Sequence, residues 1–181
     1  MQQFMKILFI RHAESTGNRE KRMQGHGDFA LTAMGRQQAK KLADRLLTEA
    51  WIPSHIYSSP LQRAAQTTQI LVEHCRAGVP VPTSIAPVND SPGTPELSSE
   101  GFAVEYADEL KEFQNGIFQG LTWVEAMARY PQQCHELETS LDWIQIPEAE
   151  SLWDARTRAF RLYPTPAQSP SEWRSNLGHY P

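Results

Sequence analysis

The segment Lys6–Asn18, with the sequence KILFIRHAESTGN, decides the fold of the chain. It begins with the apolar run Lys6–Ile10, which is typical of a strand buried on both faces of a parallel sheet. The polar residues Arg11–Asn18 follow directly, so we expect them at the carboxyl end of that strand, where α/β enzymes bind their ligands. An arginine and a histidine in a short polar loop at this place indicate chemistry on an anion and favour a phosphate.

The length and charge of the chain restrict its class. With 181 residues it suits one domain with a sizeable core, and its net charge of −4 argues against a nucleic-acid-binding surface. No segment is recognisable as a signal peptide or is long enough to cross a membrane, so we expect a cytoplasmic protein. Cys75 and Cys134 match no metal-binding or redox spacing and are expected to be reduced thiols. We therefore expect neither a metal nor another cofactor.

The segment after the first loop is predicted to alternate helices and strands. Apolar residues at helical spacing predict a helix capped by Thr32, and His55–Ser58 predicts a second short strand. Ser59 and Pro60 then predict the start of another helix, with Arg63 in its first turn. The order strand, helix, strand, helix is the one expected of a mostly parallel sheet covered by helices.

The second half of the chain contains a loop, two more helices and a tail. Residues 78–100 are rich in Pro, Ser, Thr and Gly and predict a long loop or lid, in which Val79–Val81 can add a small strand. Thr122 and Glu125 predict a capping box, and Ser151 predicts the start of a helix that reaches about residue 162. Residues 163–181 show no periodicity and predict an irregular or disordered tail, which leaves a domain of residues 1–162.

Five blocks of the sequence, taken in order, resemble the signatures of the histidine phosphatase superfamily, the phosphoglycerate-mutase-like proteins. The blocks are Arg11–Ser15 with Asn18; Gln24-Gly25, Asp28, Leu31-Thr32 and Gly35; Tyr57–Leu61, Arg63-Ala64 and Gln66-Thr67; Leu110–Glu112, Gly116 and Gln119–Thr122; and Glu150-Ser151 with Asp154 and Arg158. Ala13 stands where the family usually has glycine. Each block is weak by itself, but the ordered set from residue 6 to residue 158 is specific. The resemblance implies a three-layer α/β/α sandwich with a mostly parallel central sheet.

The resemblance also implies a mechanism and a set of site residues. Phosphoryl transfer requires a nucleophile in line with the leaving oxygen, and the family's first histidine, here His12, is that nucleophile. Glu112 would donate a proton to the leaving oxygen, for which it must be protonated part of the time, as burial and the charge of the phosphate would favour. The phosphate would be bound by the following set of residues: Arg11, Asn18, Gln24, Gly25 and Arg63.

One part of the family pattern is missing from the sequence. The family carries a second phosphate-binding histidine, in a His-Gly pair that follows a late apolar strand, and no such strand follows Leu162. His179 has no strand before it and no helix after it, so we do not expect it to take this role. Three explanations stay open: a truncated or frame-shifted gene, a natural variant whose tail covers the gap, or a degenerate relative without catalysis.

The favoured function is the hydrolysis of a small phosphate monoester, and activity is expected to be weakened by the missing histidine. The segment around Glu112, with the sequence GLTWVE shortly after it, resembles the phosphatase branch of the family. The chain also lacks the insertion that glycolytic mutases carry after that glutamate. A phosphoglycerate mutase is the alternative enzyme, and an inactive relative that binds phosphate esters is the alternative from another class. The oligomeric state stays open.

Overall fold

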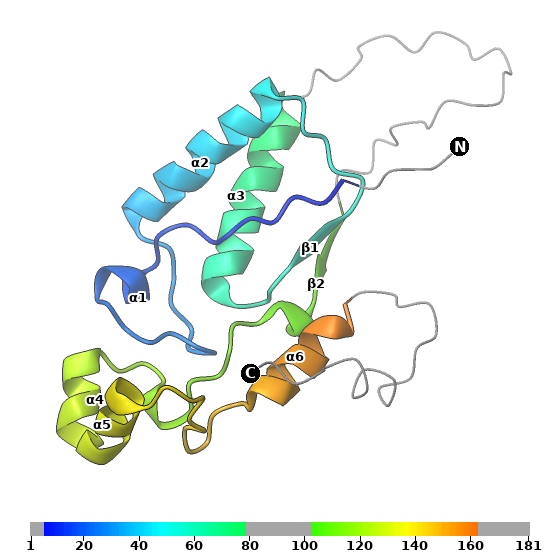
Figure 1. The fold of residues 1–181 in the computed structure, drawn as a ribbon. Helices are drawn as coiled ribbons and strands as arrows, with labels where there is room; N and C mark the ends of the chain where they lie inside the picture. Colours follow the sequence, from blue (N-terminus) through cyan, green and yellow to red (C-terminus); the bar gives the residue numbers. More distant parts are fainter. Residues whose placement is uncertain (1–5, 79–102, 163–181) are drawn as a thin grey trace, which may run out of the picture.

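The computed structural model describes residues 6–78 and 103–162 and shows an α/β fold with a small parallel sheet (Figure 1). In chain order the elements are α1 (Thr16–Arg19), α2 (Ala33–Thr48), β1 (Ile56–Ser58), α3 (Gln62–Gly78), β2 (Val104–Tyr106), the 3₁₀ helices η1 (Asp108–Leu110) and η2 (Gly116–Phe118), α4 (Trp123–Arg129), α5 (Pro131–Thr139) and α6 (Leu152–Phe160). The predicted α/β class with parallel strands is thus confirmed.

The sheet places the ends of two strands next to each other. β1 pairs in parallel with β2, and Ile56, Tyr57 and Ser58 lie opposite Val104, Glu105 and Tyr106. The ladder continues one step further, because the Ala107 N–H donates to the Ser58 carbonyl at 2.9 Å. At this carboxyl end β1 leads into α3 and β2 leads into η1. Two polar segments that are distant in sequence therefore begin side by side.

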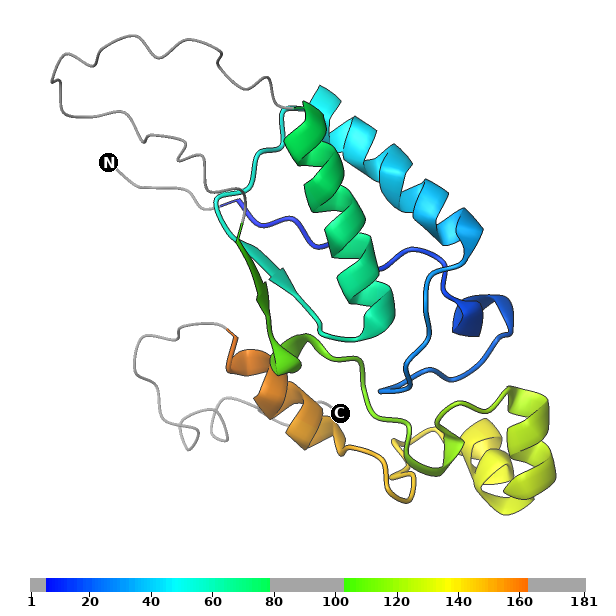
Figure 2. The ribbon, with the colours of Figure 1, turned by 180° about the vertical axis from the view of Figure 1, so that it is seen from behind.

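Helices α2 and α3 pack against each other on one side of the strands, as the two opposite views show (Figures 1 and 2). Small residues allow the close approach of α2, since Ala39 and Ala43 are 1% and 0% exposed. Leu71 and Val72 of α3 are also buried. These two helices are the longest of the described elements, and α3 carries Arg63 in its first turn.

A second hydrophobic cluster lies around α4 and α5. Phe118, Leu121, Ala126 and Cys134 are buried there, and Tyr130 packs on the cluster, with its ring 5.9 Å from that of Phe118. Burial raises the pKa of the Cys134 thiol. Both cysteines are free, as predicted.

The prediction of a buried strand at residues 6–10 is wrong. This segment is extended but is assigned to no strand, and Ile7, Leu8, Phe9 and Ile10 are 50%, 46%, 74% and 40% exposed. An apolar run becomes a buried strand only where neighbouring strands bond to it and other elements cover it. In the described part of the chain, β1 and β2 pair with each other instead.

The predicted caps of α2, α4 and α6 are confirmed, while the predicted start of α3 differs. Thr32, Thr122 and Ser151 each accept a hydrogen bond from the N–H three residues further on. Helix α3 begins at Gln62 and not at Pro60, and the Ser59 hydroxyl accepts from the Leu61 N–H at 3.3 Å. Helix α5 was not predicted, although Pro131 at its first position was a signal for it. The strand predicted at residues 79–81 and the tail at 163–181 lie outside the described residues.

Candidate active site

The loop that carries His12 is anchored to helix α3. The Ala13 N–H donates to Thr67 Oγ1 at 3.1 Å, and the same hydroxyl donates to the Arg63 carbonyl at 2.7 Å. The loop ends at Ser15, which caps α1 in a capping box with Asn18. His12 is therefore held beside the first turns of α3.

The ring of His12 has a defined tautomer. Its Nδ1 lies 2.8 Å from the carbonyl oxygen of Ala13. A carbonyl oxygen can only accept, so Nδ1 carries the proton and Nε2 carries the lone pair. Burial lowers the pKa of His12 below 6.5, and the positive charges of Arg63 and Arg11 lower it further. The neutral imidazole is therefore the favoured form near neutral pH.

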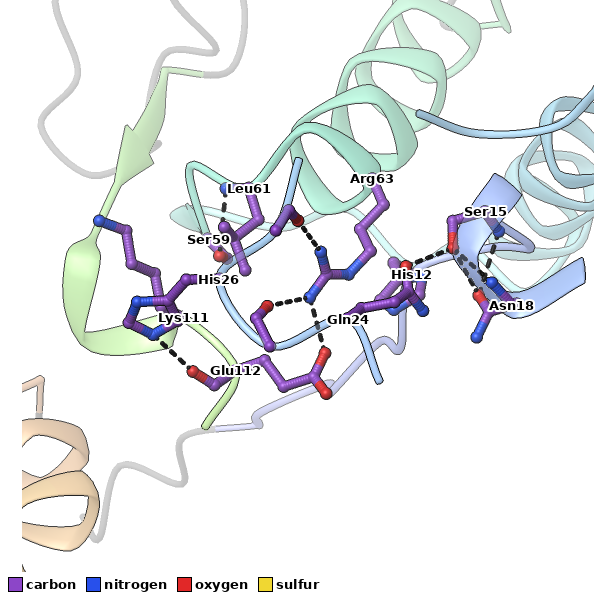
Figure 3. A network of polar contacts seen from close by, with 12 residues as sticks. His12, Ser15, Asn18, Gln24, His26, Ser59, Leu61, Arg63, Lys111 and Glu112 are labelled. Atoms are coloured by element: carbon purple, nitrogen blue, oxygen red, sulfur yellow. Dashed lines mark hydrogen bonds and ion pairs between the residues drawn. The ribbon is translucent and has the colours of Figure 1, made fainter. Parts of the chain in front are cut away.

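Arg63 is the most deeply buried charged side chain of the site, with 1% of its surface exposed. Its Nη1 donates to the carbonyl of Gly27 at 2.9 Å, and its Nη2 donates to the carbonyl of Gly25 at 2.7 Å. Nη2 also forms an ion pair with Glu112 Oε2 at 2.6 Å. The guanidinium thus lies where the turn at residues 25–27 meets the segment that follows η1 (Figure 3).

Glu112 comes from the segment that follows β2 and points toward Arg63 (Figure 3). Its side chain is 44% exposed, which differs from the burial expected of this carboxyl group. The residue is also held through its main chain, because its carbonyl oxygen accepts a hydrogen bond from the Nε2 of His26 at 2.8 Å. The Glu112 carboxylate is thus partly accessible to solvent beside its ion pair with Arg63, while the main chain of Glu112 is held by His26.

Asn18 and Gln24 are joined through Ser15. The Ser15 N–H donates to Asn18 Oδ1 at 3.0 Å, and the Ser15 hydroxyl donates to Gln24 Oε1 at 2.5 Å. Gly17 makes the packing possible, since a Cβ at this position would lie 2.6 Å from the Gln24 side chain. With both amide oxygens engaged, the amide N–H groups are what these two side chains can offer to an anion.

The structure brings three of the sequence-predicted groups together and places the others around them. His12 lies in the electrostatic field of Arg63, Arg11 and Glu112, and Arg63 bonds directly to Glu112 and to the Gly25 carbonyl. Asn18 and Gln24 lie on the α1 side of the His12 loop, where both contact Ser15 (Figure 3). The Arg11 side chain lies at the exposed start of the loop.

Sequence reasoning missed the role of Arg158 and His26 in shaping this site. Arg158 forms a two-pronged ion pair with Glu150, with both N···O distances at 2.7 Å, which holds the pKa of Glu150 below its usual range. Its Nη1 also donates to the carbonyls of Glu109 and Lys111, at 2.8 and 2.9 Å. Arg158 therefore shapes the turn immediately before Glu112. It was recognised only as part of a motif, and His26 matched no motif.

Among the described residues, no group of three or more His, Cys, Asp or Glu side chains is arranged to hold a metal ion. No helix in that part of the chain has both the length and the apolar character needed to cross a membrane.

The fold and the ordered motifs agree with the comparison with known families. The family model of the histidine phosphatase superfamily (branch 1) matches residues 7–85 and 94–171. The chain therefore belongs to the histidine phosphatase superfamily.

Two proteins of Arabidopsis thaliana are similar to most of this chain. Phosphoglycerate mutase-like protein 4 of Arabidopsis thaliana is 31% identical over 162 residues, which are 87% of this chain and 60% of that protein. The metal-independent phosphoserine phosphatase of the same plant is 30% identical over 149 residues, which are 82% of this chain and 52% of that protein.

Solved structures show the same fold. A mycobacterial glucosyl-3-phosphoglycerate phosphatase in complex with VO₃ has a TM-score of 0.59 and 27% identity, covering 83% of this chain and 59% of that one. Bacillus stearothermophilus YhfR has a TM-score of 0.61 and 26% identity, covering 84% of this chain and 62% of that one. The chain thus spans between 52% and 62% of the length of these four relatives.

Proposed function

We propose that this chain hydrolyses a small phosphate monoester through a phosphohistidine intermediate on His12. The observation that carries the proposal is the meeting of His12, Arg63 and Glu112, which come from three separate segments of the chain. Together they offer a nucleophile, a cation and a carboxyl group, which are the groups that transfer of a phosphoryl group requires.

The nucleophile of the proposed reaction is Nε2 of His12. The hydrogen bond from Nδ1 to the Ala13 carbonyl fixes the ring and leaves the lone pair on Nε2. The lowered pKa keeps that nitrogen unprotonated at neutral pH. Nε2 attacks the phosphorus atom, the bond from phosphorus to the ester oxygen breaks, and the electron pair leaves with that oxygen.

Arg63 is the main phosphate-binding group in this proposal. Its fork is already oriented by the carbonyls of Gly25 and Gly27, so little side-chain freedom is lost when an anion binds. Arg11 and the amides of Asn18 and Gln24 complete the proposed phosphate site. A phosphate dianion would compete with the Glu112 carboxylate for Nη2 of Arg63 and repel its charge, which favours the protonated carboxyl group.

Glu112 is the proposed proton donor. In its protonated form it gives a proton to the leaving oxygen and releases the alcohol. Water then attacks the phosphohistidine, the carboxylate of Glu112 accepts the proton of that water, and inorganic phosphate leaves His12 free. The same residue thus serves both halves of the reaction, and no further co-reactant is needed.

Phosphoglycerate mutase-type transfer is the second candidate, because a similar plant protein carries a mutase-like name. A mutase returns the phosphoryl group to a second hydroxyl of a glycerate. It therefore predicts the interconversion of two phosphoglycerates and little release of inorganic phosphate. A phosphatase releases inorganic phosphate from several unrelated monoesters.

The experiment is a turnover assay with p-nitrophenyl phosphate on the full chain and on His12→Ala. The matched control is His55→Ala, because His55 lies at the far end of β1 and its ring bonds to the neighbouring Ser54. Turnover by the wild type and the control, with none in His12→Ala, supports the proposal. Equal rates in all three proteins would remove it, and phosphate-ester binding without turnover would identify a non-catalytic relative.

A further inference from the structure

His26 contacts the main chain of the proposed proton donor. Its Nε2 lies 2.8 Å from the carbonyl oxygen of Glu112, and since a carbonyl only accepts, the imidazole N–H donates (Figure 3). The N–H of His26 itself donates to Gln119 Oε1 at 3.1 Å. The residue is therefore bonded by its ring and by its backbone to the segment 112–119.

The same turn that carries His26 also orients Arg63. The carbonyls on either side, those of Gly25 and Gly27, both accept from the Arg63 guanidinium. Gly25 has a φ of +48°, and a Cβ there would lie 3.0 Å from Gln119 Oε1. The turn at residues 25–27 therefore packs closely against the segment 112–119. Its glycine carbonyls bind Arg63, and the ring of His26 binds Glu112.

The backbone of Glu112 is consequently held at two successive carbonyls. Arg158 bonds to the carbonyl of Lys111 at 2.9 Å, and His26 bonds to that of Glu112. The carboxylate itself is 44% exposed, and its ion pair is with Arg63, the group for which a bound phosphate would compete. Once that ion pair opens, the two backbone contacts are what remains to aim the carboxyl group.

We propose that His26 is a positioning residue for Glu112, linking the turn that orients Arg63 to the segment that supplies the proton donor. The inference rests on the proposed function, because it concerns the proton donor of that reaction. His26 acts through Glu112 and not on the phosphate, so its loss should affect proton donation more than phosphate binding.

The leaving group of the substrate distinguishes these two effects. An alkyl phosphate such as β-glycerol phosphate releases an alkoxide, which requires a proton, whereas p-nitrophenolate departs as a stable anion. Because Glu112 also assists hydrolysis of the phosphohistidine, a step common to both esters, the two esters are compared by kcat/KM, which reports only the steps up to departure of the leaving group. General acid catalysis contributes about 10²–10⁴-fold, so a misdirected Glu112 should lower kcat/KM on β-glycerol phosphate by about tenfold or more and change kcat/KM on p-nitrophenyl phosphate by no more than about twofold.

The experiment measures kcat and KM of the full chain on both esters for wild type, His26→Leu, His26→Gln and Glu112→Gln. Glutamine can place an amide N–H near the position of the imidazole Nε2, so His26→Gln should restore most of the activity on β-glycerol phosphate. Glu112→Gln should show the same preference between the two esters in stronger form. His55→Leu is the matched control and should behave as wild type.

The outcomes separate this inference from the function on which it rests. A selective loss of kcat/KM on β-glycerol phosphate in His26→Leu, restored in His26→Gln, supports it. Equal losses on both esters, or no loss, overturn it while the proposed function stands. If His26→Leu does not fold, His26→Gln and His26→Asn carry the test, because asparagine is too short to reach the carbonyl and should show the selective loss. Absence of His12-dependent turnover on both esters overturns the proposed function and the inference together.

Discussion

The substitution Arg63→Met tests whether the buried guanidinium organises the site. Methionine has a similar length but no N–H groups, so it can fill the space without donating hydrogen bonds. The change removes the bonds to the Gly25 and Gly27 carbonyls, at 2.7 and 2.9 Å, and the ion pair with Glu112. The substitution therefore removes the polar contacts of Arg63 while keeping most of the volume of its side chain.

The expected loss of stability follows from the burial of each partner. The buried Gly25 carbonyl costs about 1–3 kcal/mol when it loses its donor, and the part-buried Gly27 carbonyl costs about 0.5–1.5 kcal/mol. The ion pair adds only about 0–1 kcal/mol, because the Glu112 side chain is 44% exposed and water can replace the guanidinium. Burial of the apolar methionine chain offsets about 1–2 kcal/mol. With the middle of each range, the net loss in the free energy of unfolding is about 2 kcal/mol.

Thermal and urea unfolding followed by circular dichroism measure this loss. For a chain of this size 1 kcal/mol corresponds to about 2–4 °C, so the Tm should fall by roughly 4–8 °C. The matched control is Arg45→Met on α2, whose ion pair with Glu49 is exposed, with 75% and 43% of the two side chains accessible. That control should change stability by less than about 0.5 kcal/mol. Equal losses in the two variants would refute the reasoning.

Three further predictions concern the surroundings of the site. Burial, and then the charges of Arg63 and Arg11, lower the pKa of His12. The midpoint of its NMR titration should therefore lie below 6.5 and should rise in Arg11→Gln. A wild-type midpoint at or above 6.5 would contradict this prediction. The lowered value also means that the unfolded chain binds more protons below pH 6.5, so His12 makes stability fall as the pH drops below that value. Thr122→Ala removes the side-chain bond of a capping box, the one that Thr122 Oγ1 accepts from the Glu125 N–H, and should cost about 1 kcal/mol in urea unfolding. Thr122→Ser should retain the cap, and an unchanged urea midpoint in the alanine variant would count against it. Gly35→Ala would bring a Cβ into the backbone oxygen of Glu14, so α2 must move away from the His12 loop. We expect the free energy of unfolding to fall by about 1–3 kcal/mol. A melting curve like that of the wild type would show that α2 and the loop are less closely packed than this.

Local features of the fold could be predicted from the sequence because their bonds are local. The caps formed by Thr32, Thr122 and Ser151 join a hydroxyl to an N–H three residues further on, so the residue types suffice. Burial of residues 6–10 could not be predicted in the same way, because it depends on partners from elsewhere in the chain. The segment at residues 6–10 is extended, as the apolar run suggested, but it is exposed and does not form the buried strand that we predicted.

The candidate site was predictable in its residues but not in its contacts. The motifs named Arg63 and Glu112, yet their ion pair joins residues that lie on separate elements and depends on the conformation of the turn at Gly25. The contact from His26 to Glu112 had no signal in the sequence, since a lone histidine beside two glycines is compatible with many roles. Only the fold shows which backbone oxygen it reaches.

The most direct test of the central claim is to trap the phosphorylated residue. The full chain is mixed with radiolabelled p-nitrophenyl phosphate, quenched in alkali, in which phosphohistidine survives, and digested for mass spectrometry. A phosphoryl group is expected on Nε2 of His12 in the wild type and in His55→Ala, and none in His12→Ala. A label on another residue, or equal labelling of His12→Ala, would contradict it.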